Sequence, residues 1–79
     1  MGEKLIQKNI KLSGEFDEYV SRHPKALERI PSGAHIVITS SRDAGLSAVN
    51  TAIARDSRSS NFIEAHKSDG KWHIRVFEK

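Results

Sequence analysis

The stretch FIEAHKSDGKWHIRVF, residues 62–77, decides the fold because it carries the clearest local signal in the chain. Asp69 and Gly70 separate two runs rich in β-branched and aromatic residues, and Asp-Gly is a preferred pair for a two-residue type I′ turn, in which both positions need a positive φ. A turn at this point predicts a β-hairpin whose facing residues have numbers that sum to 139. Three of the predicted cross-strand pairs are Phe62 with Phe77, Glu64 with Arg75, and His66 with His73.

The hairpin is predicted to have one apolar face and one mixed face, because side chains alternate along a strand. The apolar face comprises Ile63, Ala65, Trp72, Ile74 and Val76. Such a face must be covered by helices. The three pairs given above lie on the opposite face, which combines aromatic, charged and imidazole side chains.

A strand and a helix are predicted before the hairpin. Residues 34–39, AHIVIT, are β-branched and short, as in a buried strand, with Ile36 and Ile38 on one face and His35, Val37 and Thr39 on the other. Residues 44–56 form a helix whose apolar stripe is Leu46, Val49 and Ile53. A six-residue strand and a helix of this length each span about 20 Å, so the next strand can run parallel to the first.

The first part of the chain is predicted to be helical. Residues 3–22 have apolar side chains at a 3.6-residue spacing, namely Leu5, Leu12, Phe16, Tyr19 and Val20, with Ile6 at the edge of the stripe. Pro24 ends this helix and suits the first turn of a short second helix over Pro24–Arg29, with Leu27 and Ile30 directed inward.

These elements predict a single domain, residues 1–79, of the α/β (α+β) class. The expected order is helix, short helix, strand, helix, strand, strand. The strands form a three-stranded mixed sheet with a C-terminal β-hairpin, and the helices cover mainly one side of it in a two-layer sandwich. Such a small chain has only one core.

Composition excludes several classes of protein. The chain has no cysteine, so it has neither a disulfide framework nor a thiolate metal cluster, which fits a cytoplasmic protein. Its longest strongly apolar run, Ile36–Ile38, is far too short to cross a membrane. The 13 basic and 10 acidic residues are interleaved and form no basic block. No glycine-rich phosphate loop is present, so no cofactor is indicated.

One linker of the chain is distinctive: His23-Pro24-x-x-Leu27-x-x-Ile30-Pro31-x-Gly33-Ala34, followed by the strand Ile36-Val37-Ile38. It occurs together with Asn9, Leu12, Phe16 and Tyr19 in the first helix, and with Leu46, Asn50 and Ala54 in the later one. In these features the chain resembles a family of small prokaryotic α/β domains of unknown function. The resemblance implies a compact α/β domain without assigned chemistry.

The histidine pair of the hairpin is a candidate site. Two facing imidazoles could share a metal ion, but zinc takes three or four protein ligands and no third ligand is expected nearby, so we predict no metal site. The pair could also cleave RNA by acid–base catalysis, with His66 and His73 transferring protons and Arg75 or Lys71 holding the phosphate. Two histidines are a weak motif, and ordinary exposed histidines are the better explanation.

A candidate anion or ligand site lies at the carboxyl end of the first strand. Ligands of α/β sheets gather at that edge. The residues expected there are Thr39, Ser40, Ser41, Arg42, His66 and His73. Helix capping alone also explains Ser and Thr residues before a helix.

A candidate interface lies on the mixed face of the sheet, where no helix is expected to cover the aromatic residues. The residues are Val37, Phe62, Glu64, Arg75 and Phe77. Because small domains gain stability by association, we expect a non-enzymatic module that binds a protein partner or a second copy of itself. The alternative is a module that binds nucleic acid, or cleaves RNA like a toxin, through the hairpin.

Overall fold

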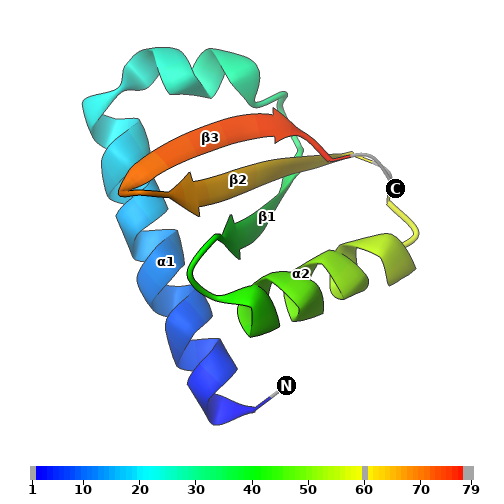
Figure 1. Cartoon of the computed structure of the whole chain (residues 1–79). Coiled ribbons are helices and arrows are strands. Elements are labelled where there is room, and N and C mark those ends of the chain that lie inside the picture. The colour runs from blue at the N-terminus through cyan, green and yellow to red at the C-terminus, as the bar shows by residue number, and fades with distance from the viewer. Residues whose placement is uncertain (1, 60, 78–79) are drawn as a thin grey trace.

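The computed structural model describes residues 2–59 and 61–77 and confirms the predicted order of elements (Figure 1). The helices are α1 (Glu3–Arg22), the 3₁₀ helix η1 (Pro24–Arg29) and α2 (Ala44–Asp56); the strands are β1 (His35–Ser40), β2 (Phe62–Ser68) and β3 (Lys71–Val76). No helix among the described residues has the length and apolar character needed to cross a membrane.

The sheet is mixed, with strand order β1-β2-β3. β1 pairs with β2 in parallel and places Thr39 beside His66, while β2 pairs antiparallel with β3 in the predicted register. Asp69 and Gly70 have φ values of 51° and 75°, as a type I′ turn requires. The order of the three strands, which pattern alone leaves open, places β2 in the centre between its parallel partner β1 and its antiparallel partner β3.

The main core lies between α1 and one face of the sheet. Phe16 from α1, Ile38 from β1 and Ala65 from β2 are buried together, and the Phe16 ring meets the Trp72 ring edge-on at 5.1 Å. This is the predicted apolar face. Val76 lies on this face by alternation, but the expectation that the helices cover it is wrong: it ends the edge strand β3 and is 69% exposed.

The opposite face carries a smaller apolar cluster. Val37 and Phe77 are buried there against Ala54 of α2, and the Phe62 ring packs beside them. The expectation that Val37 and Phe77 face solvent is therefore wrong. α2 lies along β1 and reaches around to this face, which adds cover where none was predicted (Figure 1).

Two predicted core positions are exposed because the helices pack through alanines. Leu27 is 54% exposed while its neighbour Ala26 is buried in η1, and Ile53 is 55% exposed while its neighbour Ala54 is buried in α2. The small alanine side chain lets the helix backbone lie close to the surface against which the helix packs. The larger residue next to the alanine, Leu27 or Ile53, then points toward solvent.

Polar side chains of α2 cover much of the free edge of β1. Asn50 donates from Nδ2 to the Ile38 carbonyl at 2.8 Å, and the Ser47 hydroxyl both accepts from the Ser40 N–H at 2.9 Å and donates to the Ser40 carbonyl at 3.0 Å. Asn50 and Asn9 also exchange two side-chain hydrogen bonds, of 2.7 and 3.2 Å. This bridge ties α1, β1 and α2 together.

Candidate functional site

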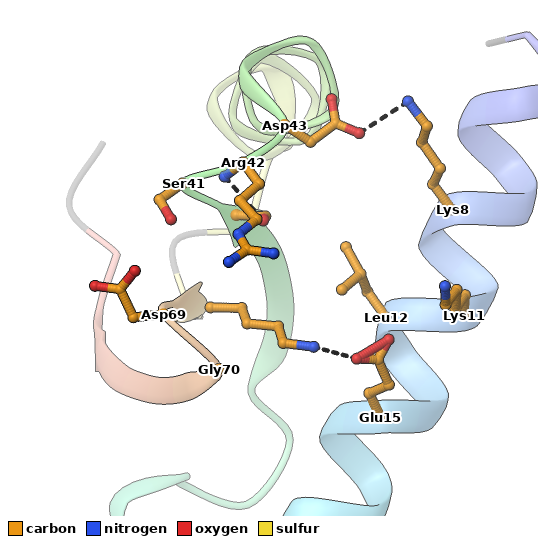
Figure 2. A pocket seen from close by; sticks show the side chains of 11 residues that line it. Lys8, Lys11, Leu12, Glu15, Ser41, Arg42, Asp43, Asp69 and Gly70 are labelled. Atoms are coloured by element: carbon orange, nitrogen blue, oxygen red, sulfur yellow. Dashed lines mark hydrogen bonds and ion pairs between the residues drawn. The ribbon is translucent and has the colours of Figure 1, made fainter.

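A cleft of about 710 Å³ lies between α1 and the turn that joins β1 to α2 (Figure 2). Its third wall is the hairpin turn at Asp69 and Gly70. The lining residues are Lys8, Lys11, Leu12 and Glu15 from α1, Ser40, Ser41, Arg42 and Asp43 from the end of β1 and the turn, and Lys67, Asp69 and Gly70 from the hairpin. The cleft is thus at the carboxyl end of β1, where ligands of α/β sheets gather.

The cleft carries four basic and three acidic side chains. Two lysines are engaged in ion pairs: Lys8 Nζ lies 2.9 Å from Asp43 Oδ2, and Lys67 pairs with Glu15. Lys11 and Arg42 form no ion pair with any other described residue. Figure 2 shows the Arg42 side chain directed into the cleft, together with Leu12.

Asp43 accounts for the capping that the sequence predicted at this turn. Its Oδ1 accepts a hydrogen bond of 3.0 Å from the Leu46 N–H at the start of α2. This hydrogen bond and, next, the bond to Lys8 lower the pKa of the Asp43 carboxyl, so it is ionised at neutral pH. Because Asp43 serves as the N-cap, capping does not explain the side chains of Ser41 and Arg42.

A second polar arrangement lies on the face of the sheet opposite α1. Thr39 is 2% exposed, and its Oγ1 lies 2.7 Å from Glu64 Oε2 and 2.7 Å from His66 Nδ1. Arg75 donates to both oxygens of Glu64, at 2.9 and 3.2 Å. The four side chains form one chain of hydrogen bonds, which we call the Thr39 network.

The Thr39 network determines which imidazole nitrogen of His66 carries a proton. Arg75 and then Thr39 hold the pKa of Glu64 below its usual value, so its carboxylate can only accept, and Thr39 must donate to it. With its single proton used, the Thr39 hydroxyl can only accept from His66. His66 Nδ1 is therefore the donor, and in the neutral ring Nε2 is left as the acceptor.

The six residues predicted to form one ligand edge are divided between two faces. Ser40, Ser41 and Arg42 line the cleft, whereas Thr39 and His66 belong to the Thr39 network and His73 stands exposed across from His66. Alternation along the strands causes the division. Arg75 forms its two bonds to Glu64, the predicted cross-strand partner, and this ion pair raises the pKa of Arg75.

An apolar groove of about 180 Å³ runs along the free edge of β1. Its lining residues are Asn9, Ser13, Ile36, Val37, Ile38, Asn50, Ile53, Ala54 and Phe62. Ile36 and Ile53 are 38% and 55% exposed. Ile6 and Ile10, which are 47% and 68% exposed, lie three residues before Asn9 and Ser13, on the same flank of α1.

The α1 residues that line the cleft and those that flank the apolar groove were not predicted from the sequence. Lys8 and Lys11 occur with Lys4 at spacings of four and three, which places them on one flank of the helix. Ile6 and Ile10, spaced by four, share the other flank. These spacings were the available signal, but only the fold shows that the flanks meet the β1–α2 turn and the β1 edge.

The chain belongs to a family of unknown function (DUF5647), whose family model matches residues 4–79. This membership confirms the predicted resemblance to small domains of unknown function. No curated protein and no solved structure is similar enough to this chain to count as a match.

Proposed function

We propose that this domain is a self-associating module in which two copies meet through the apolar groove at the β1 edge. The observation that carries the proposal is the concentration of exposed isoleucines around this groove. Ile36 and Ile53 line it, and Ile6 and Ile10 flank it on α1. An exposed apolar patch rimmed by polar residues is typical of a protein interface.

The exposed area of the chain supports a partner of ordinary interface size. The accessible surface is 5566 Å², whereas a compact monomer of 8.8 kDa exposes about 4,800 Å². The excess of about 800 Å² equals roughly what one partner buries in a standard interface.

A second copy is the occupant that fits best, because the same face carries both a protrusion and a recess. Ile53 stands 55% exposed beside the groove. A cavity of about 150 Å³ is enough for benzene, so a groove of about 180 Å³ has room for an isoleucine side chain. In a two-fold dimer, Ile53 of each copy would enter the groove of the other, which satisfies the self-complementarity of such an interface.

The predicted interface residues take unequal parts in this proposal. Val37 and Phe62 line the groove. Phe77 supports Phe62 from within, with ring centroids 6.2 Å apart. Glu64 and Arg75 form their ion pair on the same sheet face, so they would lie at the polar rim.

The test is sedimentation equilibrium of the chain and two variants over a micromolar to millimolar range. The proposal requires a dimer for the parent chain and a monomer for Ile53→Lys, because a buried ammonium without a partner opposes association. Leu27→Lys is the matched control: Leu27 is 54% exposed but lies on η1, outside the groove. This variant should dimerise like the parent.

Two results would contradict the proposal. One is a parent chain that remains monomeric across the whole range. The other is a dimer that Ile53→Lys and Leu27→Lys weaken equally, which would assign the interface elsewhere. Circular dichroism spectra of both variants verify that each remains folded.

The alternative of nucleic-acid binding or RNA cleavage by the hairpin has less support. Arg75 donates two hydrogen bonds to Glu64, so one of the two cations considered for holding phosphate is already occupied. His66 Nδ1 is likewise engaged with Thr39. An unchanged rate of RNA hydrolysis on His73→Ala would rule out the catalytic form of this alternative.

A further inference from the structure

We infer that the cleft between α1 and the β1–α2 turn binds the phosphate group of a small organic molecule. Four basic side chains from three separate parts of the chain converge there: Lys8 and Lys11 from α1, Arg42 from the turn and Lys67 from β2. The site is distinct from the groove proposed for association, and none of its lining residues lines that groove.

The charges of the cleft leave two cations for a ligand. Asp43 and Glu15 neutralise Lys8 and Lys67 at the two ends of the α1 wall. Lys11 and Arg42 have no acidic partner among residues 2–59 and 61–77. An anion in the cleft would therefore find basic side chains that can form charge-assisted hydrogen bonds without breaking either ion pair.

The types of donor favour phosphate. The Arg42 guanidinium offers a planar fork that matches two phosphate oxygens, and the Lys11 ammonium adds a point charge. The Ser41 hydroxyl lies on the same wall as Arg42 and is exposed. Among the described residues, the Ser41 hydroxyl donates no hydrogen bond, so its proton is available to a ligand.

The remaining walls favour a small molecule over a polymer. The volume of about 710 Å³ is in the range of small-molecule sites. Leu12, directed into the cleft, offers an apolar contact for the organic part of the ligand (Figure 2). Glu15, Asp43 and Asp69 interrupt the positive surface, so a long polyanion would meet carboxylates on leaving the site, whereas a single phosphate would not.

The experiment is a titration followed by the backbone amide signals in two-dimensional NMR spectra. Adenosine monophosphate is the probe, with inorganic phosphate, adenosine and a single-stranded oligothymidylate in separate arms. The inference predicts saturable shifts at Ser41, Arg42 and Lys11 with adenosine monophosphate, weaker saturable binding of inorganic phosphate, and no saturable shifts with adenosine. Shifts that follow ionic strength alone, or tighter binding of the oligonucleotide per phosphate, would overturn it.

Variants separate a specific site from general attraction to a basic protein. Arg42→Gln should weaken adenosine monophosphate binding by roughly tenfold or more, since a charge-assisted bidentate contact is lost. Arg29→Gln is the matched control, because Arg29 is an exposed arginine of η1 outside the cleft and its removal changes the net charge equally. Equal weakening by the two variants would refute the site. The oligomeric state should be the same in both variants, so this test is independent of the dimer.

Discussion

The face of the sheet under α1 is held by apolar contacts of Phe16 with Ile38 and Trp72, whereas the opposite face combines a smaller apolar cluster with the Thr39 network. Both faces are built from the same three strands, and alternation alone assigns neighbouring residues such as Ile38 and Thr39 to different environments. The first face should contribute a stability that is independent of pH. The second should contribute a stability that depends on the charge of Glu64.

The largest effect is expected from Phe16→Ala, which removes the central side chain of the α1 face. Phe16 is 5% exposed, and a buried Phe→Ala substitution costs about 3–5 kcal/mol. Urea denaturation at one protein concentration should give a similar loss at pH 7 and pH 5. A loss below about 1 kcal/mol would mean that the α1 face is not the main core.

Thr39→Val tests the opposite face with little change in shape. The substitution leaves His66 Nδ1 without its hydrogen-bond partner and Glu64 Oε2 with Arg75 alone, and an unsatisfied buried group costs about 1–3 kcal/mol. Long-range ¹H–¹⁵N NMR spectra should show the Nδ1–H tautomer of His66 in the parent chain and a mixture in the variant. Thr51→Val is the control, because Thr51 donates only to carbonyls of its own helix. An Nε2–H tautomer in the parent would contradict the network.

Glu64→Gln should cost about 1–2 kcal/mol at pH 7, as expected for loss of a charged hydrogen-bond acceptor. The pKa of Glu64 is lowered on folding, chiefly by Arg75, so the carboxylate stabilises the fold above the unfolded pKa, and this contribution is lost as the pH falls through the folded pKa. The difference between parent and variant should therefore shrink toward zero in acid. Glu18→Gln, in an exposed pair with Arg22, should change stability by less than about 1 kcal/mol.

Val76→Thr should have the smallest effect, although Val76 belongs by alternation to the α1 face. The side chain is 69% exposed, and exposed substitutions usually change stability by less than about 0.5 kcal/mol. Chemical denaturation of parent and variant in parallel measures the difference. A loss of unfolding free energy above that level would show that Val76 is buried in solution, and that the covered part of this face extends to the end of β3.

The sequence predicted those parts of the fold that depend on local chemistry. Asp69 and Gly70 determine the turn, the turn determines the register, and the register predicts the Glu64–Arg75 and His66–His73 pairs, all of which the structure contains. The length of the helix between β1 and β2 predicted their parallel pairing.

The sites were less predictable because they depend on how elements approach one another. α2 packs through Ala54 and leaves Ile53 exposed, because the smaller residue allows closer packing. The spacing of hydrophobic residues does not predict this. The bridge between Asn9 and Asn50 joins residues 41 apart in the chain, and the cleft likewise unites Lys11 with Arg42. No local pattern connects such residues, so only the assembled fold could reveal these juxtapositions.

The Asp69-Gly70 turn also has a consequence for the order in which the chain folds. The β2–β3 hairpin needs only a two-residue loop to close, whereas pairing of β1 with β2 requires the whole α2 crossover to be in place. Closing the shorter loop costs less entropy, so we expect the hairpin to form early and to act as the template on which β1 docks. Substitutions at the turn should therefore slow folding, whereas substitutions in β1 should mainly accelerate unfolding.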